Sequence, residues 1–147
     1  MDYIRIGEKK LDTCYTKRCG AYAIIEREQD KKIAIVDHGK FFFLGGGLEK
    51  DETEEQALKR EIIEEAGYGI KNVQFFNKVL AWEVSQSRGP LDITATFYLA
   101  KFDQKIALPI EKDYKILWVN PAEYIPKLHY EYQRYILKKY VELRDRK

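Results

Sequence analysis

Cysteine, proline and long apolar runs are all scarce in this chain. Its 147 residues include two cysteines and four prolines, and so few cysteines exclude the disulfide framework of a small secreted domain. The longest apolar stretches, such as 21–25 and 41–44, fall far short of the ~18 residues that a membrane span needs. The first five residues lack the apolar core of a signal peptide. We therefore expect a cytoplasmic protein with no membrane partner.

Charge of one sign is also scarce, because 26 basic and 24 acidic residues leave a formal net charge of +2. No broad basic patch is evident, so a nucleic-acid partner is not expected. With 45% hydrophobic residues the chain is not a disordered tail. Its length fits a single domain over residues 1–147 that needs neither metal nor disulfide to fold. The assembly state is open, and a homodimer is compatible with the sequence.

Strand and turn patterns predict a sheet that contains two hairpins. Strand-like runs cover 20–28, 33–36, 41–44, 73–84, 92–101 and 114–119. Turn residues at 37–40 and 85–90 join neighbouring runs, so we expect a hairpin at each place. The three glycines at 45–47 are expected to break regular structure.

Two helical regions complete the predicted α/β fold. Thr53 and Gln56 form a capping box ahead of a helix that ends at Ala66, with Gly67 as its stop. Asn120 and a following proline begin a second helical region, in which apolar residues recur at helical spacing as far as residue 143. Three strands, a helix, three strands and a helix suggest a mixed sheet with helices packed on it.

The one concentration of charge lies in residues 46–67, which hold eight acidic and three basic side chains. At about 100° per residue, Glu61, Glu64 and Glu65 share one face beside the apolar stripe of the helix. Three like charges at a core boundary need a compensating cation, and Arg60 balances only part of them. Carboxylate ligands without His or Cys favour Mg²⁺ or Mn²⁺ over Zn²⁺. A solvated acidic helix is the alternative.

Two features outside the helix support the cation site. The glycines at 45–47 can bring a backbone carbonyl, such as that of Gly46, close to a metal or a phosphate. Glu52 lies just before the helix and can reach Arg60, which would hold the guanidinium in place behind the ligands. The segment therefore predicts a metal site together with its supporting ion pair.

This segment resembles the Nudix box. The match runs Gly46, five residues, Glu52, seven residues, Arg60-Glu61-Ile62, one residue, Glu64-Glu65, one residue and Gly67. Since all seven invariant positions are present, the chain is similar to the Nudix hydrolases, and most of all to their small MutT-like group. The resemblance implies a Nudix-type α/β/α sandwich with a mixed β-sheet.

The resemblance also implies an activity and a set of site residues. It implies a Mg²⁺-dependent (or Mn²⁺-dependent) hydrolase that cleaves a diphosphate bond in a nucleoside triphosphate or another nucleoside diphosphate-linked substrate, by metal-activated water. The family's metal ligands fall on Glu61, Glu64, Glu65 and the Gly46 carbonyl, with Glu52 and Arg60 orienting them. The stretch 82–86 lacks the Pro or Tyr that tends to mark ADP-ribose or dinucleoside polyphosphate cleavage, which favours a triphosphate.

Candidate residues outside the box are fewer and less specific. Many family members use a further acid as base or ligand; Glu111 is the first candidate, followed by Asp113 and then Glu83. Arg18 is a candidate for phosphate binding and Trp82 for stacking on a nucleobase. A surface arginine and a core aromatic residue are the plain alternatives for these last two.

Two other functions stay open on the sequence alone. A Nudix-fold domain can bind a nucleotide as a sensor without cleaving it, although a pure sensor has no need of the complete set of acids. An interaction protein that only carries an acidic helix needs no metal. Phosphate release from a panel of nucleotides, with and without Mg²⁺, separates the three.

Overall fold

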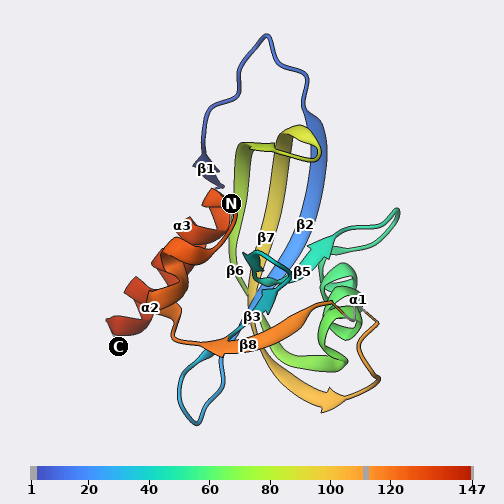
Figure 1. The fold of residues 1–147 in the computed structure, drawn as a ribbon, viewed down its shortest axis with the longest axis vertical. Coiled ribbons are helices and arrows are strands. Elements are labelled where there is room, and N and C mark those ends of the chain that lie inside the picture. Colours follow the sequence, from blue (N-terminus) through green and yellow to red (C-terminus); the bar gives the residue numbers. More distant parts are fainter. Residues whose placement is uncertain (1–2, 111–112, 147) are drawn as a thin grey trace.

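The computed structural model describes residues 3–110 and 113–146, and arranges them as two sheets with helices on both sides (Figure 1). The elements are β1 (Ile4–Ile6), β2 (Thr16–Ile25), β3 (Ile33–Asp37), β4 (Phe41–Phe42), β5 (Leu44–Gly47), α1 (Glu54–Ala66), β6 (Tyr68–Ser85), β7 (Gly89–Lys105), β8 (Lys115–Val119), α2 (Pro121–Tyr124), the 3-10 turn η1 (Ile125–Lys127) and α3 (Glu131–Asp145). None of these helices is long and apolar enough to cross a membrane.

The larger sheet is mixed, as predicted. Its strand order is β1-β6-β7-β2-β5, and a second sheet has the order β4-β3-β8. β2 runs parallel to β7, with Arg18 opposite Ile93, and β1 runs parallel to β6. The β6–β7 and β2–β5 pairs are antiparallel. The α/β class and the mixed sheet are therefore confirmed.

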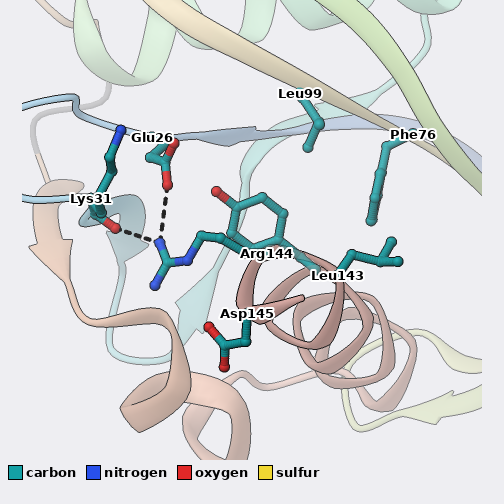
Figure 2. Close-up of a pocket in the computed structure, with 8 residues that line it drawn as sticks. Glu26, Lys31, Phe76, Leu99, Leu143, Arg144 and Asp145 are labelled. Atoms are coloured by element: carbon teal, nitrogen blue, oxygen red, sulfur yellow. Dashed lines mark hydrogen bonds and ion pairs between the residues drawn. The ribbon is translucent and has the colours of Figure 1, made fainter. Parts of the chain in front are cut away.

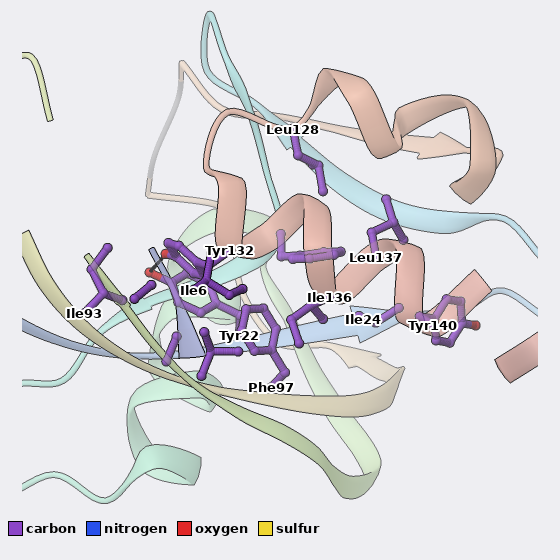
Figure 3. Packing of buried hydrophobic residues seen from close by; sticks show 14 of the residues in the cluster. Ile6, Tyr22, Ile24, Ile93, Phe97, Leu128, Tyr132, Ile136, Leu137 and Tyr140 are labelled. Carbon is purple, nitrogen blue, oxygen red and sulfur yellow. Dashed lines mark hydrogen bonds between the residues drawn. The ribbon is translucent and has the colours of Figure 1, made fainter. Parts of the chain in front are cut away.

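Each face of the larger sheet is covered by one of the long helices. Side chains of β2 alternate between the faces: Tyr22 and Ile24 belong to the cluster that includes residues of α3, and Ala21 and Ala23 belong to the cluster under α1. Figure 3 shows the α3 side, where large aromatic and branched side chains fill the space. Alanines on the other face let α1 pack close to the sheet.

Glycines 45–47 form a strand, contrary to the expectation that they would break regular structure. Gly45, Gly46 and Gly47 pair antiparallel with β2, where Gly20 lies opposite Gly47. A Cβ atom on Gly45 would collide with the backbone of Ala21, and the φ of Gly45 is 134°. Only glycine tolerates both this close approach and a positive φ. The lack of side chains, which disfavours an isolated strand, therefore allows this close pairing with β2.

The other differences concern element limits. The predicted strand at 41–44 is divided, because Phe41–Phe42 pairs with β3 and the chain then crosses to the larger sheet at Phe43. β1 was not predicted; three residues carry too short a pattern. The predicted helix after Thr53 and its capping box are confirmed, with Gly67 as the left-handed C-cap.

Candidate active site

Arg60 is the centre of an ion-pair cluster on α1. Its Nε and Nη2 atoms donate to the two carboxylate oxygens of Glu52 at 2.7 and 2.9 Å. Nη2 also donates to the Gly47 carbonyl at 3.0 Å. The Nη1 atom donates to Glu61 at 3.0 Å and to Glu64 at 3.5 Å. Arg60 thereby joins the loop before α1, the strand β5 and two acids of the helix.

The predicted contact between Glu52 and Arg60 is present in a bidentate form. The guanidinium, with help from the Glu49 N–H, lowers the pKa of Glu52 to about 2. Glu52 is therefore ionised throughout the neutral range, and its carboxylate holds the guanidinium by two parallel bonds.

Glu61 lies against the glycine strand. A Cβ atom on Gly46 would come within 2.5 Å of the Glu61 carboxylate carbon, so the carboxylate occupies space that any side chain at position 46 would take. Burial raises the pKa of Glu61; the Arg60 hydrogen bond opposes this shift, and the neighbouring charge of Glu64 adds to it. A carboxylate in these surroundings gains from a second cation beside it.

Glu65 is more deeply placed than the helical projection indicated. Its side chain is only 6% exposed, and its Oε1 atom accepts a hydrogen bond from the Gly45 N–H at 3.0 Å. The projection placed the three acids beside the packing stripe, but Glu65 is part of the buried surface between α1 and β5.

The acids fit a hard divalent cation in their chemistry. Among residues 3–110 and 113–146, no three His, Cys, Asp or Glu side chains already converge as a metal cage; Glu61 and Glu64 instead share the Nη1 atom of Arg60. All the donors are oxygens, which suits Mg²⁺ or Mn²⁺. The bare backbone at Gly46 leaves room for the Glu61 carboxylate beside the strand.

A cavity of about 390 Å³ adjoins this cluster. Arg18 and Glu65 line it together with Gly45 and Gly46, and most of its other walls are aromatic or polar. The lining residues are Arg18, Tyr22, Val36, His38, Phe42, Phe43, Gly45, Gly46, Glu65, Ser87, Arg88, Tyr114, Tyr130 and Gln133. Within the described residues, the Arg18 Nε atom is buried without a hydrogen-bond partner. The cavity thus offers a cation and aromatic rings next to the acids.

Not every candidate from the sequence reaches this cavity. Trp82 is absent from the lining; its neighbours Ala81 and Glu83 face α3, so the alternation of β6 turns Trp82 to the opposite face of the sheet. Asp113 is exposed and is also absent from the lining. Glu111 lies outside the described residues.

The sequence did not indicate several residues that line the cavity. Gln133 and Tyr130 come from the start of α3, Phe42 from β4 and Arg88 from the β6–β7 turn. These segments are distant along the chain and carry no shared spacing. Only the three-dimensional fold brings them together.

A second and larger cavity lies elsewhere and carries no acid of the box. Its volume is about 860 Å³, and its walls include Phe76, Leu99 and Tyr140 (Figure 2). Across it, Arg144 donates to the Glu26 carboxylate at 3.0 Å and to the Lys31 carbonyl. Since Glu26 follows the end of β2 that is remote from Arg18, this cavity is separate from the acidic cluster.

Glu83 supports α3 and does not face the acids. Its Oε1 atom accepts a hydrogen bond from the Glu131 N–H at 2.8 Å, at the first turn of a helix whose N-cap residue, Tyr130, provides no side-chain cap. Glu83, which lies in β6, therefore serves as the N-terminal cap of α3. Its Oε2 atom is buried without a hydrogen-bond partner among the described residues.

This buried cap predicts a pH-dependent stability. Burial raises the pKa of Glu83 above its ordinary 4.5, so the folded protein binds this proton more tightly than the unfolded chain. The free energy of unfolding should fall as pH rises from about 4 through the raised pKa. In Glu83→Gln this contribution is absent, so its melting temperature relative to the wild type should rise between pH 4 and 7. An unchanged difference over that range would contradict the prediction.

Comparison with known proteins identifies the family. The NUDIX domain model matches residues 16–140. Among solved structures, a MutT Nudix hydrolase from Burkholderia pseudomallei is 24% identical, with a TM-score of 0.63, over 84% of this chain and 97% of that one. The E. coli ORF135 protein is 25% identical, with a TM-score of 0.65, over 88% and 92%. No curated protein matches the chain significantly.

These matches cover the same region as the glycine strand and the acidic helix. A mixed sheet between helices, with this cluster on α1, is the architecture of a Nudix pyrophosphohydrolase. The chain belongs to the Nudix family, and its resemblance to the MutT-like members is confirmed.

Proposed function

We propose that the protein is a Mg²⁺- or Mn²⁺-dependent hydrolase that cleaves a diphosphate bond in a nucleoside triphosphate or another nucleoside diphosphate-linked compound. The observation that carries this proposal is the Glu61 carboxylate lying against Gly46, a glycine that also lines a cavity with an arginine and aromatic walls. An acidic cluster alone would bind cations. The adjoining cavity adds a place for an anion with an aromatic group attached.

Each group of residues has a distinct task in this proposal. Glu61, Glu64 and Glu65 would hold the cation. Arg60 would keep its hydrogen bonds to Glu52 and to the Gly47 carbonyl, while the hydrogen bonds from its Nη1 atom to Glu61 and Glu64 would break so that these two carboxylates can bind the cation. When bound, Mg²⁺ polarises phosphoryl oxygens and lowers the pKa of a coordinated water. Arg18 would bind a phosphate, because its buried Nε–H is an unused donor at the cavity wall.

The Gly46 carbonyl is a weaker ligand candidate than the three acids. The Leu48 N–H donates to the Cys19 carbonyl of β2, while the Gly47 carbonyl points outward to Arg60. In an antiparallel strand, alternate residues direct both backbone groups to the same neighbour, so the backbone of Gly46 is directed to β2. We therefore propose that Gly46 makes room for Glu61.

Glu111 remains our proposed water-activating acid. The preceding segment is tied to the end of α1, since the Ile106 N–H donates to the Gly67 carbonyl at 2.8 Å and the Ile110 N–H donates to the Glu64 carbonyl at 2.9 Å. An acid that follows Ile110 in the sequence is therefore a better candidate than Glu83, which caps α3.

Metal removal is the direct test. Phosphate or pyrophosphate release from a panel of nucleoside triphosphates should vanish in EDTA and return with Mg²⁺ or Mn²⁺, because without the cation the phosphoryl oxygens are not polarised and the pKa of the water is not lowered. Mg²⁺ should also raise the melting temperature, since it binds the folded chain. Full turnover in chelator would exclude this mechanism. Nucleotide binding without product release, with metal present, would instead favour the sensor.

A further inference from the structure

Phe43 lies where the chain crosses from the smaller sheet to the larger one. It follows β4 and precedes β5, so neither strand includes it. The residue is 1% exposed, and a buried backbone N–H needs a partner. That partner is a side chain of α3: the Phe43 N–H donates to Gln133 Oε1 at 3.0 Å.

Gln133 is itself held on its other side. It is fully buried in the first turn of α3, and its Nε2 atom donates to the Tyr132 hydroxyl at 3.4 Å. That hydroxyl donates to the hydroxyl of Tyr22 at 3.3 Å, and Figure 3 shows these two tyrosines meeting in the core between α3 and the sheet. Both ends of the Gln133 amide are therefore engaged.

A side chain from the opposite helix holds the same segment two residues further on. The Gly45 N–H donates to Glu65 on α1. The segment that enters β5 is thus held by α3 at Phe43 and by α1 at Gly45. Gly46, against which the Glu61 carboxylate lies, comes next.

We propose that Gln133 is a positioning residue for the hydrolytic site. Gln133 accepts the hydrogen bond from the Phe43 N–H and thereby fixes where β5, the glycine strand, begins. This in turn sets the position of β5 relative to Glu65 and Glu61. Gln133 acts through Phe43 and Gly45, not by contact with the reacting atoms. The inference rests on the proposed function for its link to catalysis, but not for its effect on the strand.

The test compares variants of Gln133 and Tyr132, two buried side chains in the same series of hydrogen bonds. Gln133→Met keeps the size of the side chain and removes the acceptor. We expect kcat to fall about 10–100-fold, because small displacements of a site cost rates of this order. The Mg²⁺ concentration for half-maximal activity should rise, while KM for the nucleotide stays within about threefold.

Tyr132→Phe is the matched control. It removes the hydroxyl that accepts a hydrogen bond from Gln133 Nε2, but it leaves Gln133 Oε1 as the acceptor for the Phe43 N–H. The melting temperature should fall about as much as in Gln133→Met, while kcat and the Mg²⁺ requirement should stay close to wild type. Gln133→Glu keeps an acceptor for the Phe43 N–H and should recover much of the activity lost in the methionine variant. If Gln133→Met does not fold, Gln133→Asn replaces it, because its shorter side chain draws the amide away from Phe43.

Amide hydrogen exchange provides a measurement that does not depend on turnover. The Phe43 and Gly45 amides should exchange faster in Gln133→Met than in Tyr132→Phe. A methionine variant that melts earlier but keeps wild-type kcat, Mg²⁺ requirement and exchange at Gly45 would overturn the proposal. If the wild type releases no phosphate, the proposed function fails. Two measurements, amide exchange at Gly45 and the shift of melting temperature on adding Mg²⁺, then still decide whether Gln133 positions the strand.

Discussion

Gly46→Ala should fold and yet lose nearly all hydrolytic activity. The new methyl group would lie within 2.5 Å of the Glu61 carboxylate carbon, closer than any non-bonded contact allows. The carboxylate is the far end of a flexible side chain, so it can swing away with little loss of stability. Its displacement from the cation site should lower kcat by at least about 100-fold, as a shift of about 1 Å can do.

Gly47→Ala is the control, because the neighbouring glycine has no such contact. The nearest atom to a Cβ at position 47 is the Cys19 carbonyl oxygen at 3.7 Å, an ordinary van der Waals distance. This variant should keep kcat within a few-fold of wild type, and both variants should melt within a few degrees of it. Equal activity losses in the two variants would show that strand flexibility, and not the space beside Glu61, is what matters.

Arg60→Ala should have the second large effect. Removing the guanidinium leaves Glu52, Glu61 and Glu64 without their shared cation and frees the Gly47 carbonyl. We expect kcat to fall about 10²–10³-fold, the range seen when a preorganised donor is removed. The melting temperature in EDTA should also drop, and Mg²⁺ should restore part of it because the cation replaces the lost charge.

Two further variants separate charge from geometry at this position. Arg60→Lys keeps the charge but cannot make the bidentate bond to Glu52, so it should remain strongly impaired. Lys59→Ala removes an exposed neighbouring charge on the same helix and should leave kcat unchanged. A lysine variant with wild-type kcat would show that Arg60 contributes charge alone.

The sequence predicts α1 and its cluster well because their determinants are local. Thr53, Gln56 and Gly67 set the ends of the helix within a few residues of it. The spacing of Arg60 from Glu52 likewise brings the pair together across the N-cap and the first turns of α1. Such features depend on the helical repeat and on short connections, which a sequence pattern records directly.

The rest of the site depends on contacts between distant segments. Nothing near glycines 45–47 indicates that β2 will pair with them, and nothing near Gln133 indicates the Phe43 N–H. The sequence leaves Glu83 as a candidate base, because it does not show that the first turn of α3 lies against this side chain and donates a hydrogen bond to it. Burial and hydrogen bonding over such separations are decided by tertiary packing, so composition and periodicity do not reveal them.

The parallel pairing of β2 with β7 has a consequence for the order of folding. Arg18 lies opposite Ile93, while β6 and β7 are joined by a short turn, so the hairpin closes a small loop and the parallel pair closes a very long one. Loop-closure entropy disfavours the long closure. The β6–β7 hairpin should therefore form early, and β2, with β5 beside it, should dock late. A chain emerging from the ribosome cannot assemble the site until β7 has been synthesised.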